Sequence, residues 1–399
     1  MGSWNYKYLL NQQTLNNINQ SNIVKRNQFV IDNLQQGIVH KLKNAGVTLY
    51  NGNAKILSVN EEQIVIAVND LRVSARYLIV AVGSQEIRLT FAHKELSYSV
   101  IYSDEMLSLQ YIPNKMVIVG AGVIGLEAAD YFNAVGCEVT LIDSAAEIGS
   151  GLDMDIANLL RKILEQRGIK IHTNAKVKEF RENDICIEKN GESFNISTET
   201  VLIAVGRIPF VEGLGLEEND INYDKNGIII DDVCRTNKCN VFACGDVTGK
   251  VLLAHTAYEQ ARIAVDNIRG MKVCMNYMLL PRIIYTSPEV MEIGLSEKEC
   301  IEKNISYIVR ELPMTYSGKY YVEHKKDGAK AKILVDASTR AVVGFSMIGD
   351  CASEIALAVE MMVANKTKIE DVAKLIFPHP TVGEILHELA EIVCADWNV

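Results

Sequence analysis

The feature that constrains this chain most is a glycine-rich turn between two strand-like runs. The turn, Gly120-Ala121-Gly122-Val123-Ile124-Gly125, follows the apolar run 116–119 and opens the helix-like run 126–135. A second apolar run, 139–142, ends in Asp143. Glycines at this spacing permit a tight turn and let the backbone approach a pyrophosphate at a helix N-terminus. Strand, glycine turn, helix, strand and acid in this order predict a dinucleotide-binding unit.

The acid that ends the second strand also indicates which dinucleotide binds. Asp143 can accept hydrogen bonds from both hydroxyls of a ribose, whereas a 2′-phosphate would be repelled by this carboxylate and would require arginines nearby. Residues 144–149 contain no Arg or Lys. The sequence therefore favours NAD over NADP.

Length and composition narrow the class of protein. A chain of 399 residues is expected to hold two or three domains, and a net charge of −10 argues against a nucleic-acid partner. The longest apolar stretch, 116–136, contains Glu127 and Asp130, so no membrane span is expected. The nine cysteines show no paired C-x-x-C spacing, which predicts a reducing cytoplasm and no metal site.

Periodicity predicts the remaining elements. A helix is expected over 24–44, because Val30, Leu34, Ile38 and Leu42 recur every four residues ahead of Gly46. The other expected helices are 156–167, 254–269 and the C-terminal ones. The other expected strands are 64–68, 77–82, 169–172, 201–205, 241–243, 282–285, 332–335 and 342–347.

Six motifs in a fixed order give the chain a resemblance to a known family. It resembles the pyridine-nucleotide disulfide oxidoreductases, and among them most the dihydrolipoamide dehydrogenases, over nearly its whole length. The motifs are the Ala81-x-Gly83-Ser84 turn, G-x-G-x-x-G-x-E at 120–127, Gly206-Arg207-Ile208-Pro209, Gly245-Asp246 with Leu252-Leu253-Ala254-His255, the run 285–290, and the run 379–384.

The resemblance implies an α/β fold in three parts. A Rossmann-like FAD domain would be interrupted by a complete Rossmann-like NAD-binding domain, and an α+β dimerisation domain would follow. The expected segments are 1–110 (first part of the FAD domain), 111–231 (NAD-binding domain), 232–276 (second part of the FAD domain) and 277–399 (dimerisation domain). The helices of the last segment carry apolar residues beyond one packing stripe, which favours a homodimer.

The resemblance also assigns residues to two cofactors, FAD and NAD. Asp246 would bind the ribityl chain of the flavin, and Gly83 and Ser84 would lie beside its nucleotide. Lys7 would match the lysine that follows the redox cysteines of the family, with a solvated surface lysine as the alternative. The flavin ring would be lined by Leu252, Leu253, Ala254 and His255. NAD would be held by Gly120, Gly122, Val123, Ile124, Gly125, Glu127, Asp143, Val177 and Gly206.

The C-terminal motif carries the proton chemistry that the resemblance implies. In the family a histidine deprotonates a substrate thiol and a glutamate hydrogen-bonds to that histidine; His379 and Glu384 fit these roles. A carboxylate on one ring nitrogen fixes the tautomer and raises the basicity of the other nitrogen. Glu384 has an alternative interpretation, because Thr381-x-x-Glu384 is also a capping box that opens a helix.

Two parts that the family requires are missing from the sequence. One is an N-terminal strand–glycine turn–helix for the ADP half of FAD. The other is the redox pair C-x-x-x-x-C, whose second cysteine aligns with Ser3. Serine can form neither the disulfide nor the thiolate that contacts flavin. Cys234 and Cys239 have this spacing but lie in a connection, so we interpret them as ordinary thiols.

The sequence therefore predicts an N-terminally truncated flavoprotein oxidoreductase of the dihydrolipoamide dehydrogenase type, inactive as it stands. The full reaction would pass electrons from a dihydrolipoyl group through a disulfide and FAD to NAD. Lipoyl domains of a 2-oxo acid dehydrogenase or glycine cleavage complex would be partners. Two alternatives stay open: another disulfide reductase of the family, such as a mercuric or glutathione-type enzyme, and a non-catalytic NAD-binding dimer.

Overall fold

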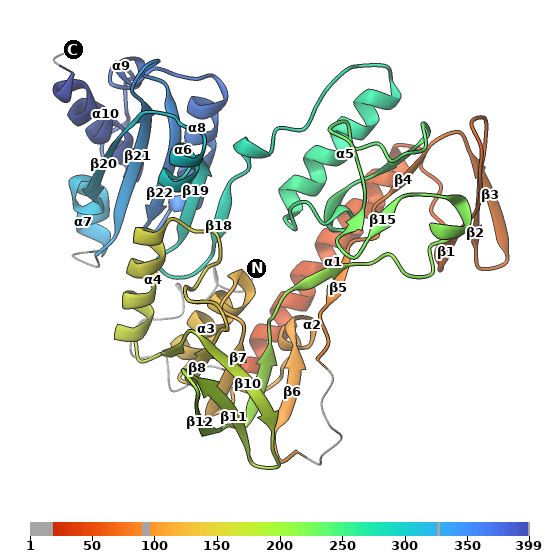
Figure 1. Ribbon diagram of the computed structural model, residues 1–399, viewed down its shortest axis with the longest axis horizontal. Coiled ribbons are helices and arrows are strands. Elements are labelled where there is room, and N and C mark those ends of the chain that lie inside the picture. The colour runs from red at the N-terminus through yellow and green to blue at the C-terminus, as the bar shows by residue number, and fades with distance from the viewer. Residues whose placement is uncertain (1–18, 90–95, 325–327, 398–399) are drawn as a thin grey trace. The chain divides into compact units, whose positions relative to one another are not determined.

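The computed structural model describes residues 19–89, 96–324 and 328–397 (Figure 1). Contacts divide the chain into two compact units. The first comprises Met1–Val24, Thr90–Val205 and Met278–Val399, and the second comprises Lys25–Leu89 and Gly206–Tyr277. The first unit therefore joins the expected nucleotide and dimerisation segments, while the end of the expected 111–231 segment falls in the second unit. The four-segment division of domains stays a prediction.

The first unit contains a five-stranded parallel sheet. Its order is β6 (Ser99–Tyr102), β13 (Thr200–Ile203), β7 (Lys115–Val119), β8 (Glu138–Ile142) and β9 (Lys170–His172). Helix α3 (Val123–Ala134) connects β7 to β8, and α4 (Met154–Gln166) connects β8 to β9. Strands β7, β8 and β13 are buried almost throughout, as parallel strands covered on both faces must be. The strand–turn–helix–strand unit is thus confirmed.

Two further sheets complete the first unit. One is an antiparallel sheet of β10 (Ala175–Phe180), β11 (Asp184–Lys189) and β12 (Glu192–Ser197). The other, near the C-terminus, is antiparallel in the order β18 (Arg282–Ile284), β19 (Val290–Gly294), β22 (Val342–Ile348), β21 (Lys330–Asp336) and β20 (Tyr307–Pro313) (Figure 1). The remaining helices are α2 (Ser103–Met106), α6 (Glu297–Glu302), α7 (Gly318–His324), α8 (Ala352–Ala364), α9 (Ile369–Val372) and α10 (Ile385–Asp396). Helix α8 packs on β19 and β22, and α10 contacts β20 and β21.

Hydrogen bonds to carboxylates connect the helices of the parallel sheet to the C-terminal sheet. The carboxylate of Glu127 accepts the N–H of Tyr285 at 2.9 Å, and that of Asp130 accepts the N–H of Ser287 at 2.9 Å. The buried Glu292 in turn accepts the N–H of Asp153, at 2.6 Å. We call this set of contacts, together with the buried Lys332 cluster described next, the joint.

Lys332 is the buried cation of the joint. Its ammonium donates to Asp153 at 2.7 Å, to Asp155 at 3.2 Å and to Glu297 at 2.8 Å, although its side chain is 1% exposed. A charge removed from water in this way is tolerated only when it is paired and hydrogen-bonded, which these three carboxylates achieve. These hydrogen bonds pull the pKa of Lys332 above its ordinary value against the effect of burial.

The second unit is built on shorter pairings. Strands β1 (Ala54–Val59), β2 (Ile64–Val68) and β3 (Leu71–Ala75) form an antiparallel sheet. Strand β4 (Leu78–Val80) runs parallel to β17 (Val241–Ala243), and β5 (Ser84–Glu86) runs antiparallel to β14 (Arg207–Pro209). The short pair β15 (Tyr223–Asp224) and β16 (Gly227–Ile228) and helix α5 (Ala254–Ile268) complete it.

Helix α1 (Gln20–Asn44) confirms the predicted helix and begins four residues earlier. It ends where Gly46 takes a left-handed φ of 73°. Its apolar stripe is uncovered: the exposed side chains are Phe29, Val30, Leu34, Ile38 and Val39.

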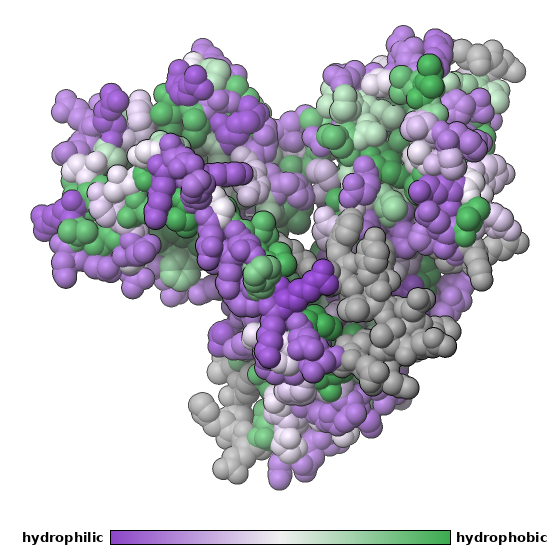
Figure 2. All heavy atoms as spheres, turned by 180° about the vertical axis from the view of Figure 1, so that it is seen from behind, coloured by the Kyte–Doolittle hydropathy of each residue, from purple (hydrophilic) through white to green (hydrophobic). Residues whose placement is uncertain are grey.

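Apolar side chains also reach the surface elsewhere, as the green areas of Figure 2 show. Among the described residues, no helix is long and apolar enough to cross a membrane.

Candidate nucleotide and proton-transfer sites

The glycine turn between β7 and α3 has the shape that a dinucleotide requires. Gly120 has a φ of 108°, and a Cβ there would collide with the carbonyl oxygen of Ala204. A Cβ on Gly125 would collide with the carbonyl oxygen of Gly120. A Cβ on Gly122, the N-cap of α3, would meet no atom within 4 Å, so open space lies at this helix end. No side chain caps the helix, and its first N–H groups can serve an anion.

Asp143 has two partners in the turn itself. Its Oδ2 accepts the N–H of Ala121 at 2.5 Å, and its Oδ1 accepts the N–H of Ala145 at 2.7 Å. An ionised carboxylate has about four acceptor positions, so each oxygen retains one for a ribose hydroxyl. The residues therefore fit NAD, and Asp143 also fixes the glycine turn, a role that the sequence alone did not indicate.

The other residues expected at NAD lie in different surroundings. Glu127, whose burial raises the pKa of its carboxyl, is engaged by Tyr285 in the joint. Val177 lies on β10 beside an irregularity in the pairing with β11. Gly206 has a φ of 119° and its carbonyl accepts the N–H of Ile87. Val123 and Ile124 form the first turn of α3. Lys7 lies outside the described residues.

The residues expected at the flavin converge at the carboxyl ends of β4 and β17. The hydroxyl of Ser84 donates to Oδ2 of Asp246 at 2.6 Å, across 162 positions of sequence. Gly83 has a left-handed φ of 76° and open space around its Cα. The carboxyl edge of adjacent parallel strands is where α/β folds bind ligands. No described donor is bonded to Oδ1 of Asp246, so this half-buried oxygen suits a polyol hydroxyl.

Helix α5 follows Asp246 and begins at the second part of the motif. Leu253 is its N-cap, and the exposed Leu252, Ala254 and His255 surround that end. Thr256 lies one residue further on, fully buried, and its hydroxyl has no hydrogen-bond partner among the described residues. An uncapped helix end with exposed apolar neighbours can receive a planar, electron-rich ring.

His379 and Glu384 form a hydrogen-bonded pair. Nδ1 of His379 lies 2.7 Å from Oε1 of Glu384, and Oε2 of Glu384 accepts the N–H of Thr381 at 2.7 Å. The Thr381 N–H and the His379 ring together hold the pKa of the Glu384 carboxyl below its ordinary value. The two interpretations of Glu384 are therefore compatible, because one oxygen caps the helix turn and the other orients the histidine. An ionised carboxylate makes Nδ1 the donor and leaves Nε2, on a side chain 78% exposed, to accept a proton.

Comparison with known proteins matches the whole arrangement. A family model described as pyridine nucleotide-disulphide oxidoreductase covers residues 2–261, and its dimerisation domain covers 280–390. Dihydrolipoyl dehydrogenase of Mycoplasma genitalium is 32% identical over 94% of this chain and 82% of that protein. A dihydrolipoyl dehydrogenase of Bacillus subtilis is 32% identical over 93% of the chain and 81% of that protein. The chain belongs to the pyridine nucleotide-disulphide oxidoreductase family.

Solved structures show the same fold. LpdA of Mycobacterium tuberculosis superposes with a TM-score of 0.87 at 23% identity, covering 94% of this chain and 84% of its own. The HOCl-induced flavoprotein disulfide reductase RclA of Escherichia coli superposes with a TM-score of 0.82 at 23% identity, covering 94% and 86%. The predicted fold class and family are therefore confirmed. Members are oxidoreductases, and the dihydrolipoyl dehydrogenases among them use FAD and NAD.

Cys234 and Cys239, which have C-x-x-x-x-C spacing, lie in different environments, and the buried Cys244 repeats this spacing after Cys239. Cys234 is buried and Cys239 is exposed. Burial raises the pKa of the Cys234 thiol to about 12, which keeps it protonated and unreactive near neutral pH. These environments support the interpretation of both residues as ordinary thiols.

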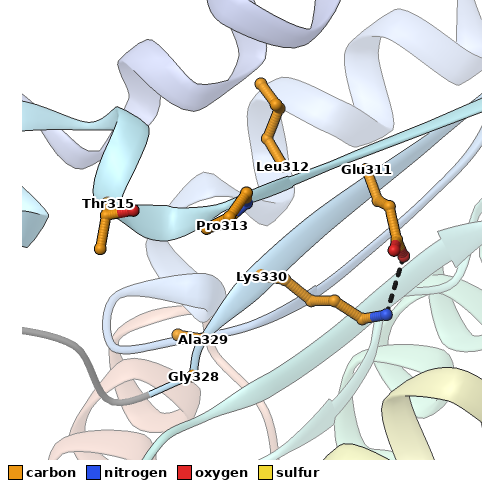
Figure 3. Close-up of a pocket in the computed structure, with 7 residues that line it drawn as sticks. All are labelled: Glu311, Leu312, Pro313, Thr315, Gly328, Ala329 and Lys330. Atoms are coloured by element: carbon orange, nitrogen blue, oxygen red, sulfur yellow. Dashed lines mark hydrogen bonds and ion pairs between the residues drawn. The ribbon is translucent and has the colours of Figure 1, made fainter.

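A separate hollow of about 410 Å³ lies in the C-terminal sheet region (Figure 3). The ammonium of Lys330 and the carboxylate of Glu311 pair across it at 2.7 Å. The remaining lining residues are Leu312, Pro313, Thr315, Gly328 and Ala329. None of the described residues expected at a cofactor or at the proton-transfer pair lines this hollow. Among the described lining residues, the charges of Lys330 and Glu311 neutralise each other.

Proposed function

We propose that this chain provides the nucleotide-binding and proton-transfer parts of a dihydrolipoyl dehydrogenase that oxidises a protein-bound dihydrolipoyl group with NAD. The observation that carries the proposal is the His379–Glu384 pair within a family dimerisation domain. Relatives of similar sequence carry the name dihydrolipoyl dehydrogenase. The dimerisation domain supports a homodimer, and lipoyl domains of a 2-oxo acid dehydrogenase or glycine cleavage complex would be the acyl-carrying partners. The nine free thiols agree with a cytoplasmic setting.

The chain's own residues have defined tasks in this proposal. Nε2 of His379 accepts a proton from a substrate thiol, and the Glu384 carboxylate stabilises the charged ring that results. Asp246 holds the polyol chain of the flavin, and the N-terminus of α3 holds the pyrophosphate of NAD. FAD and NAD supply the two-electron transfer when bound. Asp143 binds the adenosine ribose and disfavours a 2′-phosphate.

The thiol relay is the part that these 399 residues do not supply. The first cysteine of the sequence is Cys137, a buried residue beside β8 whose pKa burial raises to about 12. A dithiol cannot transfer electrons to flavin in this mechanism without a reactive cysteine pair. We therefore propose that the 399-residue chain does not oxidise dihydrolipoamide.

One experiment compares two acceptors for the same donor. The purified chain, supplied with FAD, is assayed with NADH and either ferricyanide or lipoamide. We expect NADH-dependent ferricyanide reduction, which needs only nucleotide and flavin sites, and lipoamide reduction no greater than a buffer control. Lipoamide turnover that disappears in Cys234→Ser would contradict the proposal. NADH binding without flavin binding would instead indicate a non-catalytic NAD-binding protein.

A further inference from the structure

A hydrogen-bond chain leads from Arg207 through Ser84 to Asp246, inside the second unit. Nε of Arg207 donates to the hydroxyl of Ser84 at 2.9 Å, and its terminal NH2 donates to the Ser84 carbonyl at 2.9 Å. The Ser84 hydroxyl then donates to Oδ2 of Asp246 at 2.6 Å. Strand pairing reinforces the contact, because Arg207 on β14 and Ser84 on β5 belong to the same two-stranded ribbon.

The chemistry of the three groups fixes the direction of every hydrogen bond. A guanidinium can only donate, so the Ser84 oxygen must accept from Arg207. A hydroxyl has one proton, and an ionised carboxylate can only accept, so this proton must point at Asp246. Arg207 thereby removes the rotational freedom of the Ser84 hydroxyl and holds one oxygen of Asp246 in place.

The backbone just before Asp246 is held by a side chain of α5. Gln260 on α5 is fully buried, and its Oε1 accepts the N–H of Gly245 at 2.7 Å. Its Nε2 donates to the hydroxyl of Tyr277 at 3.0 Å. Gly245 itself needs a left-handed φ of 76°. With the Gly245 N–H and Oδ2 of Asp246 both hydrogen-bonded, Oδ1 of Asp246 is available as a prepositioned acceptor.

We propose that Arg207 is a positioning residue for the flavin subsite, acting through Ser84 to orient the Asp246 carboxylate toward the hydroxyls of the ribityl chain. This inference rests on the proposed flavin role of Asp246 and adds a requirement to it. We call the hydrogen-bond chain from Arg207 through Ser84 to Asp246 the brace. Preorganised acceptors lose less ordering entropy when a ligand binds, so removal of the brace should weaken binding of the polyol and leave binding of the ring unchanged.

Two probes separate the polyol from the ring. Riboflavin carries the ribityl chain, and lumiflavin has the same ring system without it. Binding of each to the purified chain is measured by quenching of flavin fluorescence. A hydrogen bond to a charged acceptor predicts roughly tenfold tighter binding of riboflavin than of lumiflavin by the unaltered chain. In Arg207→Met and Ser84→Ala the ratio of riboflavin affinity to lumiflavin affinity should fall toward one, while the affinity for lumiflavin changes little.

Conservative and matched variants sharpen the comparison. Arg207→Lys keeps the charge but cannot make the two-pronged contact with Ser84, so it should behave like Arg207→Met. Arg88→Met removes another arginine close to the same ribbon, one that contacts Glu86 at 3.5 Å, and should retain the ratio of the unaltered chain. Asp246→Asn reports on the flavin subsite itself and should lose the ratio.

The outcomes distinguish the inference from the function on which it rests. If Asp246→Asn loses the preference for riboflavin over lumiflavin and both Arg207 variants keep it, the positioning role of Arg207 is wrong and the flavin role of Asp246 stands. If the unaltered chain shows no preference for riboflavin, or binds neither probe, the flavin role of Asp246 is wrong and the inference falls with it.

A second measurement tests the brace without any flavin. Thermal unfolding of Arg207→Met, Asp246→Asn and the double variant forms a double-mutant cycle. If Arg207 acts through Asp246, the drop in melting temperature of the double variant should be smaller than the sum of the two single drops, by about 2–4 °C. Strictly additive losses would show that the hydrogen-bond chain does not exist in solution and would overturn the proposal.

Discussion

At the scale of single residues, Glu292 is a carboxyl that makes stability depend on pH. It is buried, and burial raises its pKa to about 6 from an ordinary value of 4.5, despite the opposing effects of the Asp153 N–H, Arg282 and Lys332. A group whose folded pKa is raised binds a proton more readily in the folded state. Its contribution to stability is therefore present below pH 4.5 and is lost as pH rises through about 6.

We expect Glu292→Gln to remove this dependence. The free energy of unfolding of the unaltered chain, relative to the variant, should fall by about 1.5 kcal/mol between pH 4.5 and pH 7.5, because the pKa of Glu292 is about 6 in the folded chain and 4.5 ordinarily. Urea unfolding at several pH values measures the difference. Glu302→Gln, at an exposed site of α6, is the control. A constant difference across this range would contradict the assignment of the proton to Glu292.

Asp143 gives a second prediction at this scale. NADH should bind more tightly than NADPH by about 1–3 kcal/mol, because of charge repulsion and ribose hydrogen bonding. Asp143→Ala should reduce this difference in binding free energy. It should also weaken the binding of NADH, since the carboxylate holds the N–H groups of Ala121 and Ala145. Titration calorimetry on the unaltered chain and the variant measures both nucleotides. Equal affinities in the unaltered chain would refute the role of Asp143 in selectivity.

At the scale of elements, helix α1 stands out because its apolar stripe is uncovered. Leu34 and Ile38 are 58% and 54% exposed.

Replacing both Leu34 and Ile38 with lysine should change the free energy of unfolding by no more than about 0.5 kcal/mol per site, because little packing is lost. Binding of the dye ANS, which reports exposed apolar surface, should fall. Gln35→Lys with Gln36→Lys adds the same charge at exposed polar sites and should leave dye binding unchanged. A large loss of stability would show that the stripe is covered in solution.

The elements also show which structures the sequence can predict. The glycine turn, α1, α5 and the strands at 64–68 and 241–243 follow from patterns within one segment, and all are present. Strand β6 is not among the expected strands, and its backbone pairs with β13, about 100 positions away. The same distinction applies at the site. His379 and Glu384 lie five positions apart and their motif predicts the pairing, whereas Glu127 meets Tyr285 across 158 positions. Contacts of that range depend on the whole topology.

At the scale of the whole molecule, α8 offers an exposed apolar surface on which we expect two copies to associate. Its inward residues Ile355, Val359 and Met362 are buried within the chain, but Leu357 and Met361 are 66% and 58% exposed on consecutive turns. We expect a homodimer that buries this pair, within the segment that matches the family's dimerisation domain.

Charged substitutions at this pair test the interface. Leu357→Asp with Met361→Asp should weaken the dimer tenfold or more, because a buried unpaired carboxylate typically costs over about 1.4 kcal/mol. Sedimentation equilibrium measures the association. Ile301→Asp places a carboxylate at an exposed apolar site of α6 and should leave the dimer intact. An unaltered chain that stays monomeric at tens of micromolar would contradict this interface.

The joint between the parallel sheet and the C-terminal sheet limits how this protein can be recombined. A chimaera that exchanged residues after 277 for those of a relative would inherit Glu127, Asp130 and Asp153 on one side only. Asp153 needs the ammonium of Lys332 from the other side. Glu127 and Asp130 instead accept the main-chain N–H groups of Tyr285 and Ser287, which any residue except proline would supply. Buried carboxylates without partners cost several kcal/mol each. Gene shuffling with a crossover near residue 277 should therefore favour parents that share both Asp153 and Lys332.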